Sequence, residues 1–177
     1  MSKTTISQKL AFSAIIVALQ IILSRYLGIQ TELFQISFGF VPIVISSMAL
    51  GPWWAATSAI LADFVGTMIA GTGAYNPMFS INAVLYALLF AWFLYNKPYS
   101  VWRIVICVLI QLIFVSIPLT PLWLYIYHKY FTGAIKAFEV IFMTKLIASI
   151  IEAVIKIVVL IPICKYLYPR LEKTLKF

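Results

Sequence analysis

The stretch MTKLIASIIEAVIKIVVLIPICKYLY, residues 143–168, decides the fold class of this chain. It is apolar over more than the roughly 20 residues that an α-helix needs to cross the hydrocarbon core of a bilayer. A backbone in hydrocarbon must satisfy its own polar groups, which a helix does within one segment. The alternation of polar and apolar residues typical of a membrane barrel strand is absent. We therefore expect this stretch to be a transmembrane helix.

Five similar apolar segments precede this stretch, and turn signals separate several of them. Gly51-Pro52, Gly71-Thr72-Gly73 and Asn96-Lys97-Pro98 interrupt the pattern, because glycine and proline end helices readily. Pro118 and Pro121 are expected to bend or unwind the last third of the fifth segment. The six segments cover approximately residues 7–26, 34–50, 53–70, 79–95, 102–127 and 143–168, with an interfacial stretch over residues 134–142. The sequence thus predicts an all-α integral membrane protein, a bundle of six transmembrane helices.

The composition supports a membrane protein and argues against a nucleic-acid binder. The chain is 64% hydrophobic and 10% charged, with a mean hydropathy of +1.05, whereas a soluble domain carries about 25% charged residues. The net charge of +8 comes from basic residues that stand singly between apolar runs, without a basic stripe or cluster. We expect a single multi-pass domain of the cell membrane over residues 1–177, with lipid around it and no nucleic-acid partner.

The distribution of lysine and arginine predicts that both termini are cytoplasmic. Cytoplasmic loops of membrane proteins carry an excess of these residues. With the N-terminus inside, the cytoplasmic ends carry Lys3, Lys9, Lys97, Arg103, Lys165, Arg170, Lys173 and Lys176, and the outer side carries Arg25, Lys129, Lys136 and Lys145.

Ionisable and polar side chains share one stripe of the last predicted helix. Its members are Lys145, Ser149, Glu152 and Lys156, whose spacing i, i+4, i+7 and i+11 places them on one side of a helix. An ionisable group in lipid costs about 2.5–3.5 kcal/mol on insertion scales, so each needs a reason. In one interpretation Glu152 and Lys156 neutralise each other. In another, Lys145, Ser149 and Glu152 line an aqueous cavity open to the outside, and both can hold.

Other polar and aromatic side chains fall at a similar depth, in the outer half of the predicted bundle. They are Gln20, Ser24 and Arg25 at the end of the first helix, and Phe79, Asn82 and Tyr86 on one face of the fourth. Asp63 in the third helix is either paired with a neighbouring helix or in contact with a ligand. Aromatic rings beside an amide suit both a flat polar heterocycle and ordinary helix packing. The convergence of these groups predicts a solute-binding pocket that faces outward.

The sequence lacks the motifs of the common enzyme and ATPase classes. It has no Walker A loop, no HExxH, no GxSxG and no histidine cluster. Cys107 and Cys164 stand alone in apolar stretches, so we expect neither a disulfide nor a metal site. We therefore expect no catalytic residues and no cofactor, and active transport would need another subunit to supply energy.

Several short motifs occur in an order and spacing that resemble one family of membrane proteins over nearly the whole chain. They are Ala14-xxx-Ala18, residues 36–42 (ISFGFVP) leading into Leu50-Gly51-Pro52, residues 62–66 (ADFVG) and residues 73–77 (GAYNP). This set resembles the substrate-binding S components of energy-coupling factor (ECF) vitamin transporters. Residues 23–27 (LSRYL), followed by residues 36–42, look most similar to the folate-specific member.

The resemblance implies a mode of action. Such proteins are six-helix bundles with cytoplasmic termini that bind a vitamin from outside and dock on a transmembrane coupling protein carried by two cytoplasmic ATPases. Their Ala-xxx-Ala helix face makes that docking contact, which gives Ala14 and Ala18 this role. The bundle is thought to topple in the membrane to release its cargo, and the outer loops, here about residues 28–35 and 74–78, act as lids.

A folate ligand gives each candidate pocket residue a role. Its flat pterin stacks on aromatic rings and needs hydrogen-bond partners at its rim, and its anionic glutamate tail favours basic groups near the mouth. We expect the rings of Phe38, Tyr75, Phe79 and Tyr86 to border the pterin, Asn76, Asn82 and Glu152 to read its edge, Arg25 and Lys145 to hold carboxylates or ring oxygens, and Ser149 to line the same cavity.

Alternatives stay open at this point. The first alternative is another vitamin of the same family's range, namely thiamin, riboflavin, pantothenate or a corrinoid. Stacking rings and a few amides suit several heterocycles, so the pocket residues alone do not exclude these. A second alternative, from another class, is a small integral membrane enzyme that acts on lipids. Such enzymes usually carry a His or Asp cluster at the cytoplasmic interface, whereas the polar groups here converge outward. A structural subunit without a ligand is a third class, against which the intramembrane Glu152 and Asp63 argue.

Overall fold

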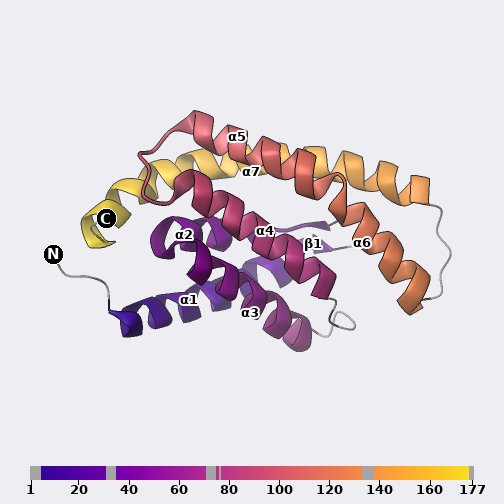
Figure 1. Ribbon diagram of the computed structural model, residues 1–177, viewed down its shortest axis with the longest axis horizontal. Helices are drawn as coiled ribbons and strands as arrows, with labels where there is room; N and C mark the ends of the chain where they lie inside the picture. The colour runs from indigo at the N-terminus through magenta and orange to yellow at the C-terminus, as the bar shows by residue number, and fades with distance from the viewer. Residues whose placement is uncertain (1–4, 31–34, 71–74, 76, 133–137, 176–177) are drawn as a thin grey trace.

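The computed structural model describes residues 5–30, 35–70, 75, 77–132 and 138–175, and the chain is almost entirely helical there (Figure 1). The elements are α1 (Ile6–Arg25), β1 (Ile29–Gln30), β2 (Gln35–Ile36), α2 (Phe40–Leu50), α3 (Pro52–Ala70), α4 (Pro77–Leu94), α5 (Val101–Gln111), η1 (Leu112–Ser116), α6 (Leu119–Tyr127), η2 (His128–Thr132) and α7 (Phe138–Leu175). Apart from β1 and β2, which pair antiparallel over two residues each, these elements are helices. The predicted all-helical class is confirmed.

Four helices of the described chain are long and apolar enough to cross a membrane. They are Ile6–Arg25, Pro77–Leu94, the continuous run Val101–Tyr130 and Phe138–Arg170. α2 is apolar but has 11 residues. The predicted segment 34–50 is helical only from Phe40, because Gln35–Ile36 pair with β1 instead. At its other end Gly51 adopts a φ of 84°, which glycine tolerates without strain, and Pro52 begins α3.

The fifth predicted helix departs from regular α geometry just before its prolines. The π-helical turn η1 follows α5, and Pro118 is the residue that precedes α6. Proline has no N–H and its ring clashes with the preceding turn, so a wider turn at this point fits the chain. The last helix, α7, begins at Phe138, which makes the end of the predicted interfacial stretch helical, while residues 134–137 lie outside the described range.

The helices form one interlocked bundle. α3 packs against α1 and α4, and α2 packs against all three of these helices. α5 and α6 each contact both α4 and α7. In Figure 1 the start of α1 and the end of α7 lie at the same end of the molecule.

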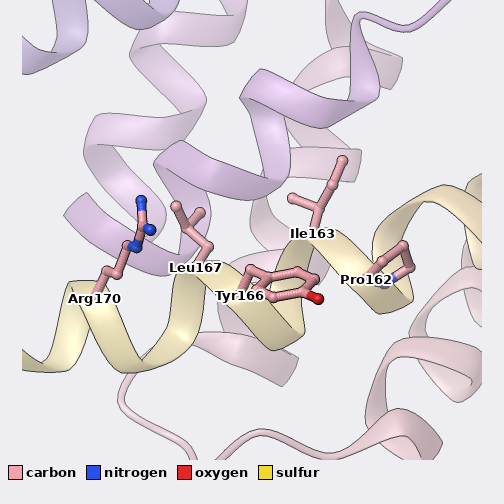
Figure 2. Close-up of a pocket in the computed structure, with 5 residues that line it drawn as sticks. All are labelled: Pro162, Ile163, Tyr166, Leu167 and Arg170. Atoms are coloured by element: carbon pink, nitrogen blue, oxygen red, sulfur yellow. The ribbon is translucent and has the colours of Figure 1, made fainter.

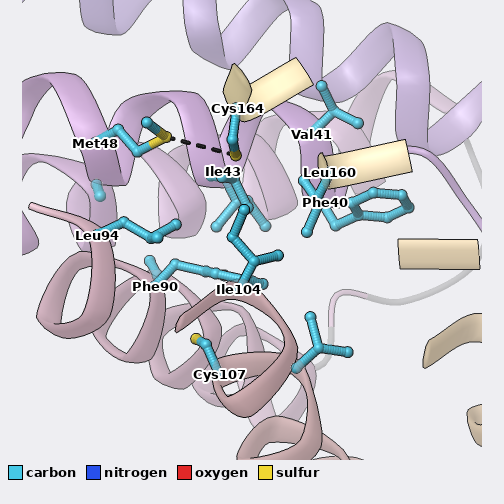
Figure 3. Close-up of a cluster of buried hydrophobic side chains, with 14 of the residues drawn as sticks. Phe40, Val41, Ile43, Met48, Phe90, Leu94, Ile104, Cys107, Leu160 and Cys164 are labelled. Carbon is cyan, nitrogen blue, oxygen red and sulfur yellow. Dashed lines mark hydrogen bonds between the residues drawn. The ribbon is translucent and has the colours of Figure 1, made fainter. Parts of the chain in front are cut away.

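A cluster of buried apolar side chains from α2, α3, α4, α5 and α7 packs between the helices (Figure 3). It combines Met48 near the end of α2, Phe90 near the end of α4, Ile104 at the start of α5 and Leu160 in the second half of α7, all of them buried. Cys164 belongs to the same cluster, with its Sγ 3.8 Å from Sδ of Met48. In lipid, close packing drives helix association, so this cluster holds the helices together.

Candidate functional site

A cavity of about 370 Å³ opens between the helices and shares Phe40 and Ile43 with the apolar cluster. Its walls come from the end of α1, the start of α2, the middle of α3, the first half of α4, η1 and α6, and the first half of α7. The volume lies within the range of small-molecule sites. Among the described residues, five charged ones line it, and the sequence places all five inside apolar helices or at their ends: Arg25, Asp63, Lys145, Glu152 and Lys156.

Arg25 on α1 and Asp63 on α3 form an ion pair at the cavity wall. Nη2 of Arg25 lies 3.2 Å from Oδ1 of Asp63 and donates a second hydrogen bond to Oγ1 of Thr67, at 2.8 Å. The Thr67 hydroxyl in turn donates to the backbone carbonyl of Asp63. Gly66 lies beside the Arg25 side chain in this contact, where a Cβ would be 3.4 Å from Nε of Arg25. Asp63 is therefore paired with a neighbouring helix while it also lines the cavity.

The second carboxylate oxygen of Asp63 extends the network to α4. The hydroxyl of Ser80 donates a hydrogen bond to Oδ2 of Asp63. Oγ of Ser80 also lies 2.7 Å from the hydroxyl oxygen of Tyr75. The ring of Tyr75 packs edge-on against Phe64, with 5.1 Å between ring centroids. A chain of polar contacts thus runs from the cavity wall to Tyr75, which does not itself line the cavity.

Glu152 and Lys156 form the second ion pair of the cavity, one turn apart on α7. Nζ of Lys156 lies 3.1 Å from Oε1 of Glu152, and the Lys156 side chain is 4% exposed. The same ammonium lies 4.8 Å from the ring centroid of Tyr86 and 5.9 Å from that of Phe40. Tyr86 is held from its far end, where its hydroxyl lies 3.1 Å from Oγ of Ser116. The lysine is neutralised by a carboxylate and bordered by two aromatic faces, which favours a buried cation.

Asn82 on α4 is fixed by two side chains of the fifth helical run. Its Nδ2 donates to Oγ1 of Thr120 at 3.2 Å, and Nε1 of Trp123 donates to its Oδ1 at 3.1 Å. Both ends of the amide are therefore oriented before any ligand is bound. An amide nitrogen carries two hydrogens, so one further donor remains after the bond to Thr120.

Lys145 differs from the other two cations of the cavity. It lines the cavity in the first half of α7 and is 9% exposed. Within the described residues its ammonium makes no hydrogen bond or ion pair, although the charge of Glu152 acts on it from a greater distance, whereas Arg25 and Lys156 each form an ion pair with a carboxylate. Among the described residues of the wall, three cations stand against two carboxylates. The geometry thus suits a ligand with an anionic group near Lys145.

The structure brings together seven of the ten residues predicted to bind a ligand. Those that line the cavity are Arg25, Phe79, Asn82, Tyr86, Lys145, Ser149 and Glu152. Phe38 precedes α2, is partly exposed and packs its ring against Phe40, with 6.2 Å between centroids. Tyr75 reaches the cavity wall only through Ser80, and Asn76 lies outside the described residues.

Several lining residues were not among the predicted ligand contacts. Phe40, rather than Phe38, presents the α2 ring to the cavity. Thr120 also lines it, and because a π-helical turn precedes α6, a regular helical wheel cannot show its facing. Gln20 lines it as well; the sequence places this amide at the right depth, which is the signal that would have found it.

A second hollow is a shallow groove along the end of α7 (Figure 2). Its side chains are Pro162, Ile163, Tyr166, Leu167 and Arg170, which come from this one helix. The groove is almost entirely apolar, so it offers a polar solute few hydrogen-bond partners. The cavity between the helices is the better candidate for a ligand site.

The predicted docking residues lie on a different surface. Ala14 and Ala18 are both exposed on α1, one helical turn apart. Small side chains at this spacing let a second helix approach closely.

Comparison with known proteins gives concordant results. Residues 8–168 match the family model described as ECF transporter, substrate-specific component. The chain is 36% identical over 140 residues to the folate transporter FolT of Clostridium novyi (strain NT), covering 79% of this chain and 78% of that protein. It is 34% identical over 118 residues to the folate transporter FolT of Leuconostoc mesenteroides, covering 65% of this chain and 63% of that protein.

A solved structure shares the fold. The crystal structure of FolT bound with folic acid superposes with a TM-score of 0.77 at 27% sequence identity, covering 88% of this chain and 90% of that one.

Proposed function

The chain belongs to the family of ECF transporter substrate-specific components, and from this premise we propose that it is the folate-binding component of such a transporter. As a member of this family it is a multi-pass protein of the cell membrane and a transport subunit rather than an enzyme. The observation that carries the folate proposal is its similarity in fold and sequence to FolT, one structure of which holds folic acid.

The chemistry of the cavity supports this ligand. Folate has a flat pterin, an aminobenzoyl linker and a glutamate with anionic carboxylates. The rings of Tyr86, Phe79 and Phe40 supply apolar faces on which a heterocycle stacks. The carboxylate of Glu152 and the oriented amide of Asn82 supply an acceptor and a donor for its rim.

The charges of the wall support an orientation for the ligand. Lys145, which lacks a carboxylate partner in the described chain, is placed to attract a glutamate carboxylate of folate. Arg25 is shared with Asp63, so we assign it a smaller part in holding this charge. Ser149, one turn along α7 from Lys145, lies between Lys145 and Glu152 in the same wall. We propose that the glutamate lies toward Lys145 and the pterin toward Glu152 and Tyr86.

We also propose the topology and partners of the chain. Its helical runs cross the membrane six times as one domain, with both termini in the cytoplasm, as the lysine and arginine distribution predicts. The exposed Ala14 and Ala18 provide a face for close contact with a transmembrane coupling protein that two cytoplasmic ATPases drive. Without these subunits the chain binds its ligand but cannot concentrate it, because binding alone only equilibrates a solute.

A calorimetric titration of the full, detergent-solubilised chain tests the proposed ligand. We expect saturable one-to-one binding of folic acid, and no binding of thiamin, riboflavin or pantothenate at the same concentrations. Saturable binding of one of these vitamins without binding of folic acid would reject folate while leaving the family membership intact. Tags at each terminus, protected from protease in sealed right-side-out vesicles, test the topology.

A further inference from the structure

Gln20 on α1 is a buried amide of the cavity wall with an unsatisfied acceptor. The side chain lines the cavity and is 6% exposed. In the part of the chain that the structure describes, its Oε1 has no hydrogen-bond partner and is closed off from solvent. Leaving a buried acceptor unpaired is unfavourable, so such a group needs a reason.

Gln20 differs in this respect from the other amide of the cavity wall. Asn82 is engaged at both ends, by Thr120 and Trp123. No hydrogen bond fixes the Oε1 end of Gln20 in the described chain, and the terminal torsion of a glutamine side chain is broad, so a rotation about it brings the oxygen to the cavity. A ligand that brings an N–H to this wall therefore gains an acceptor that no side chain of the described protein occupies.

The packing of α1 against α2 places Gln20 at the aromatic level of the cavity. The two helices contact each other at Gly39, where a Cβ would lie only 2.9 Å from Cβ of Ser24. The chain runs in opposite directions in α1 and α2. The residue one helical turn before Ser24 therefore lies near the level of the residue one turn after Gly39. Gln20 shares the cavity wall with Ile43 and Phe40, and the Phe40 ring borders Lys156 of the second ion pair.

We propose that Gln20 is a specificity-determining residue of the cavity, whose amide oxygen turns toward the ligand and accepts a hydrogen bond from an N–H of the bound heterocycle. This inference rests on the proposed folate function, since it assigns the heterocycle to the aromatic half of that site. It explains why a polar side chain with an open acceptor is kept beside Phe40 and Ile43 in a membrane helix.

The test compares two buried glutamines that share the same defect but differ in position. Gln111 is 1% exposed and both of its amide atoms lack partners among the described residues, yet it does not line the cavity. Methionine matches glutamine in length and removes the amide, so Gln20→Met and Gln111→Met form a matched pair. Folic acid affinity, the melting temperature of the ligand-free chain and the inhibition constant of 4-aminobenzoyl-glutamate, which lacks the pterin, are measured for both.

We expect Gln20→Met to weaken folic acid binding by about fivefold to tenfold, the effect of one net hydrogen bond. Its inhibition constant for 4-aminobenzoyl-glutamate stays unchanged, and its ligand-free melting temperature does not fall. Gln111→Met leaves both affinities unchanged. Should Gln20→Met fail to fold, Gln20→Leu replaces it in the same comparison.

Two results would overturn the inference separately from the function. If Gln20→Met binds folic acid with an affinity within twofold of wild type, Gln20 does not contact the ligand. If the variant loses affinity equally for folic acid and for 4-aminobenzoyl-glutamate, Gln20 does not bind the heterocycle. Failure of the wild-type chain to bind folic acid overturns the proposed function itself, and the Gln20 assignment with it.

Discussion

The guanidinium of Arg25 and the carboxylate of Asp63 join α1 to α3 at the cavity wall, with 3.2 Å between Nη2 and Oδ1. The same nitrogen donates to Thr67 on the next turn of α3. Two anchors on one helix fix the direction of the guanidinium, and the side chains of both charged residues are less than a quarter exposed. The pair thus sets the shape of the wall before any ligand arrives.

Replacement of Asp63 by asparagine tests this pair. It leaves the Arg25 charge without its carboxylate and weakens the acceptor for Ser80. We expect a loss of about 1–3 kcal/mol in the free energy of unfolding, in the range for one partner removed from a partly buried charged hydrogen bond. The melting temperature of the ligand-free chain in detergent measures it.

A control variant separates the contribution of the Arg25–Asp63 ion pair from that of the Ser80 hydrogen bond. Ser80→Ala removes the donor to Asp63 but keeps the ion pair, so it should lower the melting temperature less than Asp63→Asn does. Equal stability of Asp63→Asn and wild type would show that the ion pair does not hold α1 against α3.

Lys145 is predicted to carry the charge recognition of the ligand. Lys145→Met removes the cation that lacks a carboxylate partner in the described chain while keeping an unbranched apolar stem. We expect folic acid affinity to fall by about 10-fold to 100-fold, as for the loss of one charge-assisted hydrogen bond. Titrations at two ionic strengths check the mechanism, because the wild-type affinity should fall with salt more steeply than that of the variant.

A matched comparison guards this prediction. 6-Hydroxymethylpterin, which carries the heterocycle without the glutamate, should inhibit folic acid binding equally well in wild type and Lys145→Met. A similar loss for both ligands would show that Lys145 supports the wall and does not hold the carboxylate.

The helical segments were predictable because length and apolar composition leave a chain in lipid few choices. The end of α2 at Gly51 and the start of α3 at Pro52 follow from local chemistry that the sequence displays. The start of α2 at Phe40 does not, because it depends on the pairing of residues 29–30 with 35–36. Wider turns such as η1 arise from packing and proline together, so the sequence shows a disturbance near Pro118 without its form.

Much of the cavity wall was predictable from depth alone. Helices that cross a bilayer run roughly side by side, so residues at equal depth on inward faces converge, as Asn82, Lys145 and Glu152 do here. Rotation about each helix axis is what the sequence leaves open. Phe40 lines the cavity and Phe38 does not, and the partner of Arg25 stands 38 residues away on another helix.

The exposed face of α1 is predicted to serve the partner and not the ligand. Ala14→Trp or Ala18→Trp places a large ring on a face where a second helix would need to approach closely. We expect such variants to bind folic acid as wild type does but to lose co-purification with the coupling protein and folate uptake. Val158→Trp, on the exposed face of α7, is the control and should retain both. Uptake by Ala14→Trp at the wild-type rate would assign docking to another face.

The two interpretations of the α7 stripe, a neutralising pair and a cavity wall, make different predictions for Glu152. Glu152→Gln leaves the ammonium of Lys156 buried beside Tyr86 without a carboxylate. We expect the free energy of unfolding to fall by about 2–3 kcal/mol, less than for a fully buried pair because the Glu152 side chain is 25% exposed. The double variant Glu152→Gln, Lys156→Met removes both charges and should recover most of that stability.

Folic acid binding by that double variant then shows whether Glu152 contacts the ligand in addition to neutralising Lys156. If Glu152 reads the rim of the heterocycle, the recovered protein should bind folic acid about tenfold or more weakly than wild type, because a neutral amide with one acceptor oxygen replaces the charged carboxylate. If Glu152 only balances Lys156, affinity returns together with stability. Both residues line the cavity, but the Glu152 side chain is 25% exposed, whereas that of Lys156 is 4% exposed beside Tyr86 and Phe40. We therefore expect the first result, in which stability is restored and affinity is not.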